Sequence, residues 1–507
     1  MRQVVRSLGV AVILAVVAAA PARAQLPQIG APRGQLRIEI GGNFSVANRS
    51  LFNGSAPLHG EWDGEFGVDL DRNLFATESM VRTITGNGSY RLSGGRSSVT
   101  ASTQKGTAII SAALGVTRRI TLFGTLPFVR ARAQTSLRLD SATANAGFNP
   151  ADPAFGTPAG AVQTAAFFAQ FQAALNTLST NIGNGSYDSD PVQKALAIQT
   201  LADGNILQSQ IGSLLLGTIS PLVPLASSPE GVTILGLVDG LQGTLSGPLG
   251  VGGFTTDPAL PGAKLTDSDF RSYLTKPAGD VQGFYRGDEI LQRPGDIEMG
   301  MVYTIVDRPA FRVAATGLVR LPTGLLDRSE DFFDVGTGDG QTDLEGRIAA
   351  DLTAGPIGAR LSFGHNRQLA RDLARRVNPL DQPIAYQFTL STVSLDPGDE
   401  TTLGIEPFLR FAPGFALAFG AFRWSHGADD MRFAGSGAPV AASAVAPSRS
   451  ATALQAGMTY SSFAGIRGRG TPIEARWAYR SVVSASGGRV DKTRTLWFQM
   501  RAYYKLW

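Results

Sequence analysis

The chain has 507 residues, no cysteine, and 17% charged against 43% hydrophobic residues. The absence of cysteine excludes a disulfide framework and a lipid-modified cysteine at the amino terminus. The net charge of +4 at pH 7 is too small to indicate a nucleic-acid partner, and we expect none.

The first 24 residues have the pattern of a cleaved export signal. Arg2 and Arg6 precede the apolar run 8–20, and Ala22 and Ala24 are small residues at the positions that a signal peptidase reads. A retained membrane anchor is the alternative, but the apolar run is short for a spanning helix. We therefore expect residues 1–24 to be removed. Three arginines would leave with them, which lowers the net charge to about +1.

From residue 36 onward, apolar and polar side chains alternate in one segment after another. Leu36, Ile38 and Ile40 share one parity, while Arg37 and Glu39 share the other. A period of two is typical of a strand with one apolar and one polar face. Twelve segments show this pattern: 36–46, 108–116, 120–128, 297–305, 311–321, 344–352, 361–363, 403–411, 415–419, 454–460, 473–479 and 496–506.

Short turns and long polar loops connect these segments in turn. Short turns are expected at 117–119, 307–309, 355–356 and 413–414, and a fifth connects the segment 454–460 to the segment 473–479. This asymmetry, with strands of about ten residues, predicts an all-β fold: an antiparallel transmembrane β-barrel with its short turns in the periplasm. An even number of strands lets the last strand pair with the first. A soluble β-sandwich is the alternative. We expect about 12 strands, or 14 if residues 79–95 form a further hairpin.

One large insert between the third and fourth strands interrupts the alternation. Residues 161–182 place Phe167, Phe171 and Leu175 at helical spacing and carry no charge. A second helix is predicted to begin with Asp190 as its N-cap and to stop near Gly204, and the apolar helical pattern resumes after it. We divide the chain into the signal 1–24, the first strands with an external loop 25–139, the helical insert 140–294, and the remaining strands 295–507. The insert is a cap or plug over the pore, a site that captures hydrophobic substrates, or a helical hairpin that packs on itself and only decorates the barrel.

Three stretches resemble outer-membrane barrels associated with the meta-cleavage pathway of phenol degradation. They are "LGVTRRITLFGTLPFVR" (114–130), "GDIEMGMVYTI" (295–305) and "LVRLPTGLLDRSEDFFDVGTGDGQTDLEG" (318–346). They are similar, more distantly, to outer-membrane transporters of long-chain fatty acids and aromatic hydrocarbons. The positions that match the pattern are Pro127, Gly295, Asp296, Pro322, Thr323, Gly324, Gly336, Gly338, Gln341, Thr342 and Asp343. Arg118 stands where the pattern has an acidic residue, and the long insert is unusual. The resemblance implies insertion by the barrel-assembly machinery.

Charged side chains share the polar parity of many strands and are the candidate residues of the barrel lumen. Both signs occur, so the lumen is predicted to be either a wet, selective passage or a filled network of ion pairs. The excess of arginine favours anionic or aromatic-acid solutes. The lumen candidates are Arg37, Glu39, Arg312, Arg320, Asp343, Glu345, Arg347, Asp351, Arg360, Glu406, Arg410, Glu474, Arg476, Arg480 and Arg501.

The sequence does not favour an enzyme. Barrel lipases use Ser with His, but Ser425 and His426 are adjacent on a predicted strand and would face opposite sides. The aspartates of 331–343 match no standard calcium loop, and no phosphate loop is complete. We therefore expect no catalytic residue, no cofactor and no metal.

These patterns together predict a porin-like channel or transporter in the outer membrane of a Gram-negative bacterium. Its expected role is passive uptake of small molecules, including aromatic or hydrophobic ones, and its expected partners are the lipid bilayer and those solutes. The alternative is a structural, binding or adhesion barrel that displays its helical insert without an open pore.

Overall fold

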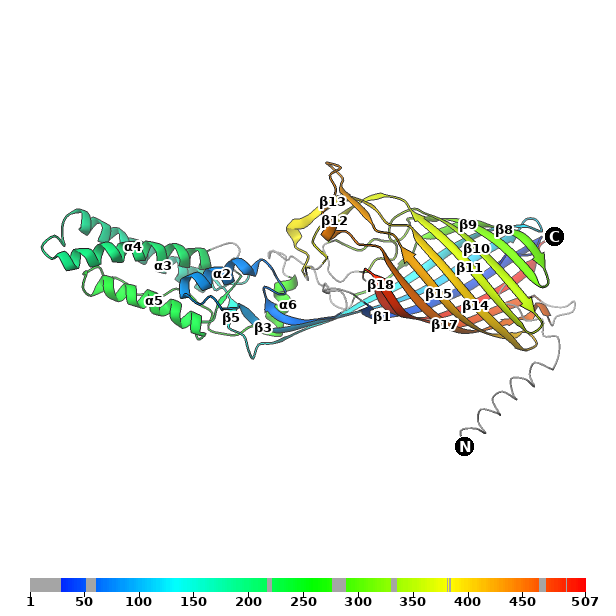
Figure 1. Ribbon diagram of the computed structural model, residues 1–507, viewed down its shortest axis with the longest axis horizontal. Coiled ribbons are helices and arrows are strands. Elements are labelled where there is room, and N and C mark those ends of the chain that lie inside the picture. Colours follow the sequence, from blue (N-terminus) through cyan, green and yellow to red (C-terminus); the bar gives the residue numbers. More distant parts are fainter. Residues whose placement is uncertain are drawn as a thin grey trace, which may run out of the picture.

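A computed structural model shows a β-barrel from which a long ribbon of two strands extends to a group of helices (Figure 1). The structure describes residues 29–51, 61–216, 221–275, 289–329, 335–380, 382, 384–464, 471–488 and 490–507. The expected export signal at 1–24 lies outside these residues.

Twelve antiparallel strands close the barrel, each paired with its two neighbours in a continuous ring. These are the twelve segments predicted from alternation, so the barrel prediction is confirmed, and the insert does lie between the third and fourth of them. The barrel strands are β1 (Gln35–Leu51), β3 (Ser93–Gly115), β4 (Ile120–Asp140), β8 (Ile297–Arg308), β9 (Phe311–Leu321), β10 (Asp343–Ala354), β11 (Ile357–Gln368), β14 (Glu400–Ala412), β15 (Phe415–His426), β17 (Arg449–Ser461), β18 (Ile473–Gly487) and β19 (Val490–Lys505).

The last strand closes the barrel against the first, as the sequence predicts. Leu36 lies opposite Tyr504 and Ile40 lies opposite Met500 in the antiparallel pairing of β19 with β1. Ile40 is 51% exposed and Met500 is 42% exposed, so this apolar parity faces outward. Because β19 pairs with β18 on one side and with β1 on the other, the barrel has no free edge of the kind that a bilayer would not tolerate.

The outer face of the barrel is apolar all around. Large apolar side chains at outward positions are about half exposed on strand after strand, including Leu122, Ile348 and Phe419. Trp477 and Phe498 on neighbouring strands pack their rings with centroids 5.6 Å apart. A soluble sandwich would bury such a surface against a second sheet, whereas here it is free to contact lipid.

The extended ribbon is made by β3 and β4, which are longer than the barrel needs. β1 pairs with β3 only as far as Ala47 opposite Thr103, yet β3 and β4 stay paired to Arg96 opposite Asp140. Two short strands flank the ribbon outside the ring: β2 (Glu61–Gly67) pairs with β3, and β7 (Glu289–Pro294) pairs with β4.

Five described helices gather at the far end of the ribbon, with the small sheet of β5 (Ala146–Phe148) and β6 (Leu222–Pro224). They share a core that includes Phe66, Phe167, Phe171 and Phe270. None of the described helices is long and apolar enough to span a membrane. The helices are α2 (Leu74–Thr85), α3 (Pro158–Gly183), α4 (Pro191–Leu215), α5 (Pro229–Ser246) and α6 (Asp267–Thr275).

Three of these helices begin with the same pair of residue types. Thr157, Asp190 and Ser228 each accept a hydrogen bond from a backbone N–H of the first turn, and each is followed by proline. A side-chain cap with proline at the first helical position satisfies one free N–H and removes the need for another. The predicted helix at 161–182 and the predicted cap Asp190 are both confirmed.

Two local predictions are wrong. Residues 79–95 do not form a hairpin, because α2 occupies 74–85 and buries Leu74, Val81 and Ile84 on one side. The second helix does not stop near Gly204 but continues to Leu215. Gly204 is buried where α4 approaches α3, and an added Cβ would lie 2.5 Å from Leu175 Cδ2. Close packing, and not helix termination, accounts for this glycine.

We expect Gly204→Ala to destabilise the helices although alanine favours a helix by about 1 kcal/mol. Leu175 is 1% exposed and has little room to move, so overpacking should cost about 2 kcal/mol. Gly236→Ala in α5 is the matched control, because nothing lies within 4 Å of its added Cβ. Circular dichroism at 222 nm would follow thermal unfolding of the full chain. Equal midpoints for the two variants would contradict the close-packing assignment.

The helices do not enter the barrel. Figure 1 places α3, α4 and α5 at the end of the ribbon that points away from the barrel, and no described helix residue lines the lumen cavity. A plug of the lumen, one of the alternatives for the insert, is therefore not the arrangement that the structure describes.

A second small sheet stands on the same end of the barrel as the ribbon (Figure 1). It contains β12 (Arg371–Arg376), β13 (Leu390–Asp396) and β16 (Asp430–Phe433). The chain between β12 and β13 buries Ile384 and Tyr386 in the core shared with Phe66 and Leu70. The base of the helical group is thus packed against this loop. Three short 3-10 helices complete the described elements: η1 (Gln387–Thr389), η2 (Ala442–Ala444) and η3 (Ser462–Ala464).

Candidate functional site

A cavity of about 860 Å³ lies inside the barrel, lined by residues from eleven of its twelve strands. Among the described residues, seven arginines and four glutamates line it. Phe123, Phe422 and Trp497 add aromatic surface from inward positions. The interior therefore combines charges of both signs with aromatic rings.

Nine of the predicted lumen residues line this cavity: Arg37, Glu39, Arg320, Glu345, Arg347, Arg360, Arg476, Arg480 and Arg501. Four more are acidic partners of these arginines, namely Asp343, Asp351, Glu406 and Glu474, at N–O distances within 4.0 Å. The other two lie near the short turns. Arg312 pairs with Asp307 at 2.8 Å, and Arg410 donates to the carbonyl of Gly355 at 3.1 Å.

The first charge network joins the strands that close the barrel. Glu39 on β1 accepts hydrogen bonds from Arg501 at 2.7 Å and Gln499 at 2.6 Å, both on β19. Glu39 is 6% exposed and also faces Arg37, whose Nε lies 3.8 Å away. On β18, Glu474 accepts a hydrogen bond from the hydroxyl of Tyr503 at 2.6 Å. Each buried carboxylate therefore has a donor from a neighbouring strand.

The second network lies across β14, β17 and β18. Glu406 pairs with Arg476 and accepts a hydrogen bond from Gln455 Nε2 at 2.9 Å. Because the amide nitrogen of Gln455 faces the carboxylate, its oxygen faces Arg480, whose Nε donates to it at 3.0 Å. The chain of contacts fixes the position of Arg480 without giving it a carboxylate.

The third network occupies the opposite wall, on β8 to β11. Arg320 bonds to Glu298 at 2.9 Å and also contacts Asp343, and Arg347 donates to Glu345 at 2.7 Å. Arg360 and Asp351 form two parallel hydrogen bonds of 2.6 and 2.8 Å. Bidentate arginine pairs of this kind hold a fixed geometry, so this wall is largely neutralised by its own carboxylates.

Sequence reasoning missed several lining residues. Glu298 and Glu400 lie on the inner parity but were not among the candidates, nor were the polar residues Asn366, Gln368 and Gln499. Trp497 shares the inward parity of Arg501 on β19. An inward aromatic side chain was the available signal for a ring in the lumen.

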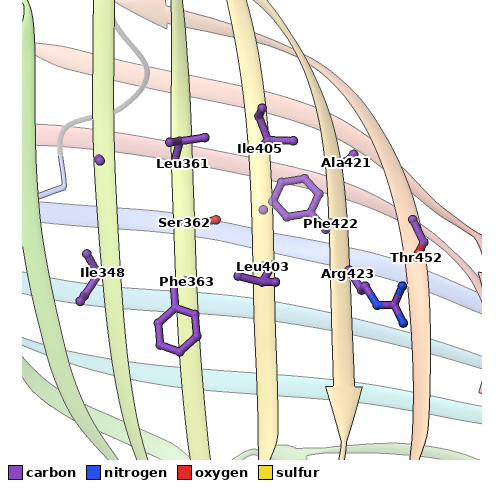
Figure 2. Close-up of a pocket in the computed structure, with 12 residues that line it drawn as sticks. Ile348, Leu361, Ser362, Phe363, Leu403, Ile405, Ala421, Phe422, Arg423 and Thr452 are labelled. Atoms are coloured by element: carbon purple, nitrogen blue, oxygen red, sulfur yellow. The ribbon is translucent and has the colours of Figure 1, made fainter.

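A second hollow, of about 530 Å³, lies along β10, β11, β14, β15 and β17 (Figure 2). Outward-facing Leu361 and Ile405 line it, together with Ser362 and Phe422, which also line the lumen cavity. Gly404 stands between the two hollows, and an added Cβ there would lie 2.7 Å from the ring of Phe422. The missing side chain lets this ring rest against the barrel wall.

The motifs that carry the resemblance meet at one place on the barrel rim. Asp296 accepts hydrogen bonds from the backbone N–H of Gly324 at 2.8 Å and of Asp339 at 3.3 Å. Thr323 donates to the carbonyl of Gly295 at 2.9 Å, and an added Cβ at Gly338 would lie 2.5 Å from the carboxylate of Asp296. These residues therefore tie the loop between β9 and β10 to the start of β8, which is a structural role.

The residues considered for catalysis do not come together. Ser425 is exposed, whereas His426 is buried and its Nδ1 lies 2.8 Å from the carbonyl of Gly427. Of the aspartates considered for calcium, Asp331 and Asp334 lie outside the described residues. Within the described part of the chain, no group of three or more His, Cys, Asp or Glu residues is arranged to hold a metal ion.

No protein-family profile and no curated protein sequence matches this chain. Among solved structures, an outer-membrane channel from Pseudomonas putida F1 is similar with a TM-score of 0.40 and 8% identity, over 96% of this chain and 99% of that chain. A FadL homologue from Pseudomonas aeruginosa has a TM-score of 0.29 and 8% identity, over 94% and 91%. The monoaromatic hydrocarbon channel CymD has a TM-score of 0.26 and 9% identity, over 94% and 89%.

Since all three are below 25% identity and below a TM-score of 0.5, the proposals that follow rest on the barrel itself.

Proposed function

We propose that this chain is an outer-membrane channel of a Gram-negative bacterium through which small molecules diffuse passively. The observation that carries the proposal is a closed ring of twelve strands with an apolar outside and a charged, hollow inside. A soluble barrel has no use for a half-exposed apolar belt, and a filled barrel has no cavity of about 860 Å³. The bilayer and the barrel-assembly machinery are the partners that such a protein needs.

The cavity favours solutes that are small and carry negative charge or aromatic surface. Asp343, Asp351, Glu406 and Glu474 pair with four of the seven lining arginines, so the attraction for anions comes chiefly from Arg480, with which no described carboxylate pairs. Charge on the wall of a wet pore attracts counter-ions and sets selectivity. The three inward rings of Phe123, Phe422 and Trp497 add surface on which an apolar part of a solute can rest.

A second candidate function is a barrel that displays its helices as a binding surface. The helical group has its own buried core and stands away from the barrel on the ribbon of β3 and β4, which favours this reading. The two candidates differ in whether the folded barrel conducts.

We expect the full chain, without its export signal, to conduct ions in planar bilayers and to prefer anions. Arg347→Gln should shift the reversal potential toward cations, because Glu345 then keeps only Arg320, 3.8 Å away. Arg432→Gln is the control, since that arginine pairs with Asp430 on β16 of the second small sheet, and neither residue lines the cavity. If protein that migrates as a folded, heat-modifiable barrel carried no current, this result would contradict the channel and favour the binding role.

A further inference from the structure

Arg480 differs from every other arginine that lines the cavity. The other six, namely Arg37, Arg320, Arg347, Arg360, Arg476 and Arg501, each lie within 4.0 Å of a carboxylate. Among the described residues, no carboxylate pairs with Arg480, and its hydrogen-bond partner is the neutral Gln455. A guanidinium that faces the cavity without an acidic partner can take an anion from the solution in the lumen.

Two aromatic rings flank the guanidinium. Its central carbon lies 4.1 Å from the ring centroid of Phe422 on β15 and 5.7 Å from that of Trp497 on β19. Arginine stacks on aromatic faces through its planar, weakly hydrated guanidinium. Stacking and the hydrogen bond from Nε to Gln455 hold the side chain of Arg480 in one orientation. The two Nη nitrogens are then left for another acceptor.

The position of Phe422 is itself determined by glycines. Added Cβ atoms at Gly404 and Gly420 would lie 2.7 and 2.6 Å from its ring. Without those side chains the ring lies flat on the wall, where Figure 2 shows it beside Ile405 and Leu403. Its inner face is then free for Arg480. The site is therefore built from the backbone upward and does not depend on a single flexible side chain.

We propose that Arg480, Phe422 and Trp497 form a binding site for a small aromatic carboxylate inside the lumen. Two parallel hydrogen bonds from the Nη nitrogens match the two oxygens of a carboxylate. Trp497, which is 38% exposed, offers the aromatic surface on which the ring of the ligand stacks. This inference rests on the proposed channel function. It adds a class of solute and the place in the lumen where that solute binds.

Sodium benzoate is the probe, applied to the full chain in planar bilayers. We expect benzoate to reduce the single-channel current at lower concentration than cyclohexanecarboxylate, which has the charge without the ring, or benzyl alcohol, which has the ring without the charge. Arg480→Gln should raise the half-blocking concentration at least tenfold. Arg480→Lys keeps the charge but loses the two Nη nitrogens that would bind the carboxylate, so it should also weaken the block of the current by benzoate. Trp497→Leu should remove the preference for benzoate over cyclohexanecarboxylate.

Arg347→Gln is the matched control, since it removes the same charge from the same cavity. We expect it to change the half-blocking concentration less than threefold. An equal effect of Arg347→Gln and Arg480→Gln would show a diffuse field and overturn the site. Current that benzoate does not block would also overturn it while leaving the channel intact.

A folded barrel that carries no current would contradict the channel but still allow the site to be tested. Saturation-transfer NMR of benzoate with the detergent-folded full chain then decides. Signal from the wild type that Arg480→Gln and Arg480→Lys lose supports the site. Absence of signal from the wild type, or its survival in both variants, overturns it.

Discussion

Glu39→Ala is expected to lower the stability of the barrel by about 3 to 5 kcal/mol, the range for breaking a buried charge pair from one side. Glu39 is the acceptor for Arg501 and Gln499 across the pairing that closes the ring. Its removal leaves Arg37 and Arg501 as neighbouring buried cations without the carboxylate between them. Urea unfolding in lipid vesicles, followed by tryptophan fluorescence and by heat-modifiable gel migration, would measure the loss.

Two further variants separate the charge from the hydrogen bonds. Glu39→Gln keeps an acceptor for Arg501 and should lose less stability than Glu39→Ala. Asp430→Ala breaks an ion pair of 3.1 Å whose side chains are both more than half exposed, and it should change stability little. If Glu39→Ala unfolded at the same urea concentration as Asp430→Ala, water in the lumen would be screening the closing pair, and the proposed role of Glu39 would be wrong.

The sequence predicted the ring of strands well because the two faces of each strand meet different surroundings. Outward positions such as Leu403 and Ile405 meet an apolar exterior, and inward positions such as Glu406 meet a polar interior, so alternation is enforced residue by residue. Where that constraint ends, the signal ends. β3 was predicted from residue 108 but begins at Ser93, because residues 93–107 are mostly serine, threonine, glycine and charged residues, which mark no apolar period.

Contacts between distant elements were beyond such patterns. Parity placed Glu406 and Arg480 inside the barrel, but it does not say that Glu406 takes Arg476 and leaves Arg480 with Gln455. That choice depends on register and reach across β17. The alternative of a hairpin at 79–95 is wrong for the same reason. Val81 and Ile84 suit a strand locally, but they complete a core with Phe171 and Ile234 from remote helices.

The clearest long-range contact is a buried carboxylate at the base of the helical group. Asp71, which is 1% exposed, accepts hydrogen bonds from Tyr386 at 2.6 Å, from Tyr273, and from the backbone of Asn73 at 2.9 Å. Tyr273 belongs to α6, whereas Tyr386 belongs to the loop that leads into β13. Burial raises the pKa of Tyr386 above its usual value, and the charge of Asp71 raises it further. The hydroxyl of Tyr386 therefore remains a donor.

Asp71→Ala should therefore release the loop from the helical group. Two buried hydroxyls would lose their acceptor, and a loss of about 2 kcal/mol corresponds to roughly thirtyfold faster local opening. Hydrogen–deuterium exchange of peptides covering α6 and residues 384–389 would measure it in the full chain. Tyr386→Phe removes one of the two bonds and should give a smaller acceleration.

Asp69→Ala is the matched control for this contact, because Asp69 is exposed two residues away. Its exchange should equal that of the wild type. Faster exchange confined to α6 would mean that Asp71 only stabilises the helix. Faster exchange in both segments would mean that one carboxylate joins two parts of the chain that are more than a hundred residues apart, and that the helical group is held at the barrel by the loop as well as by the ribbon. Exchange in Asp71→Ala that matched Asp69→Ala would show that apolar packing of Ile384 is sufficient.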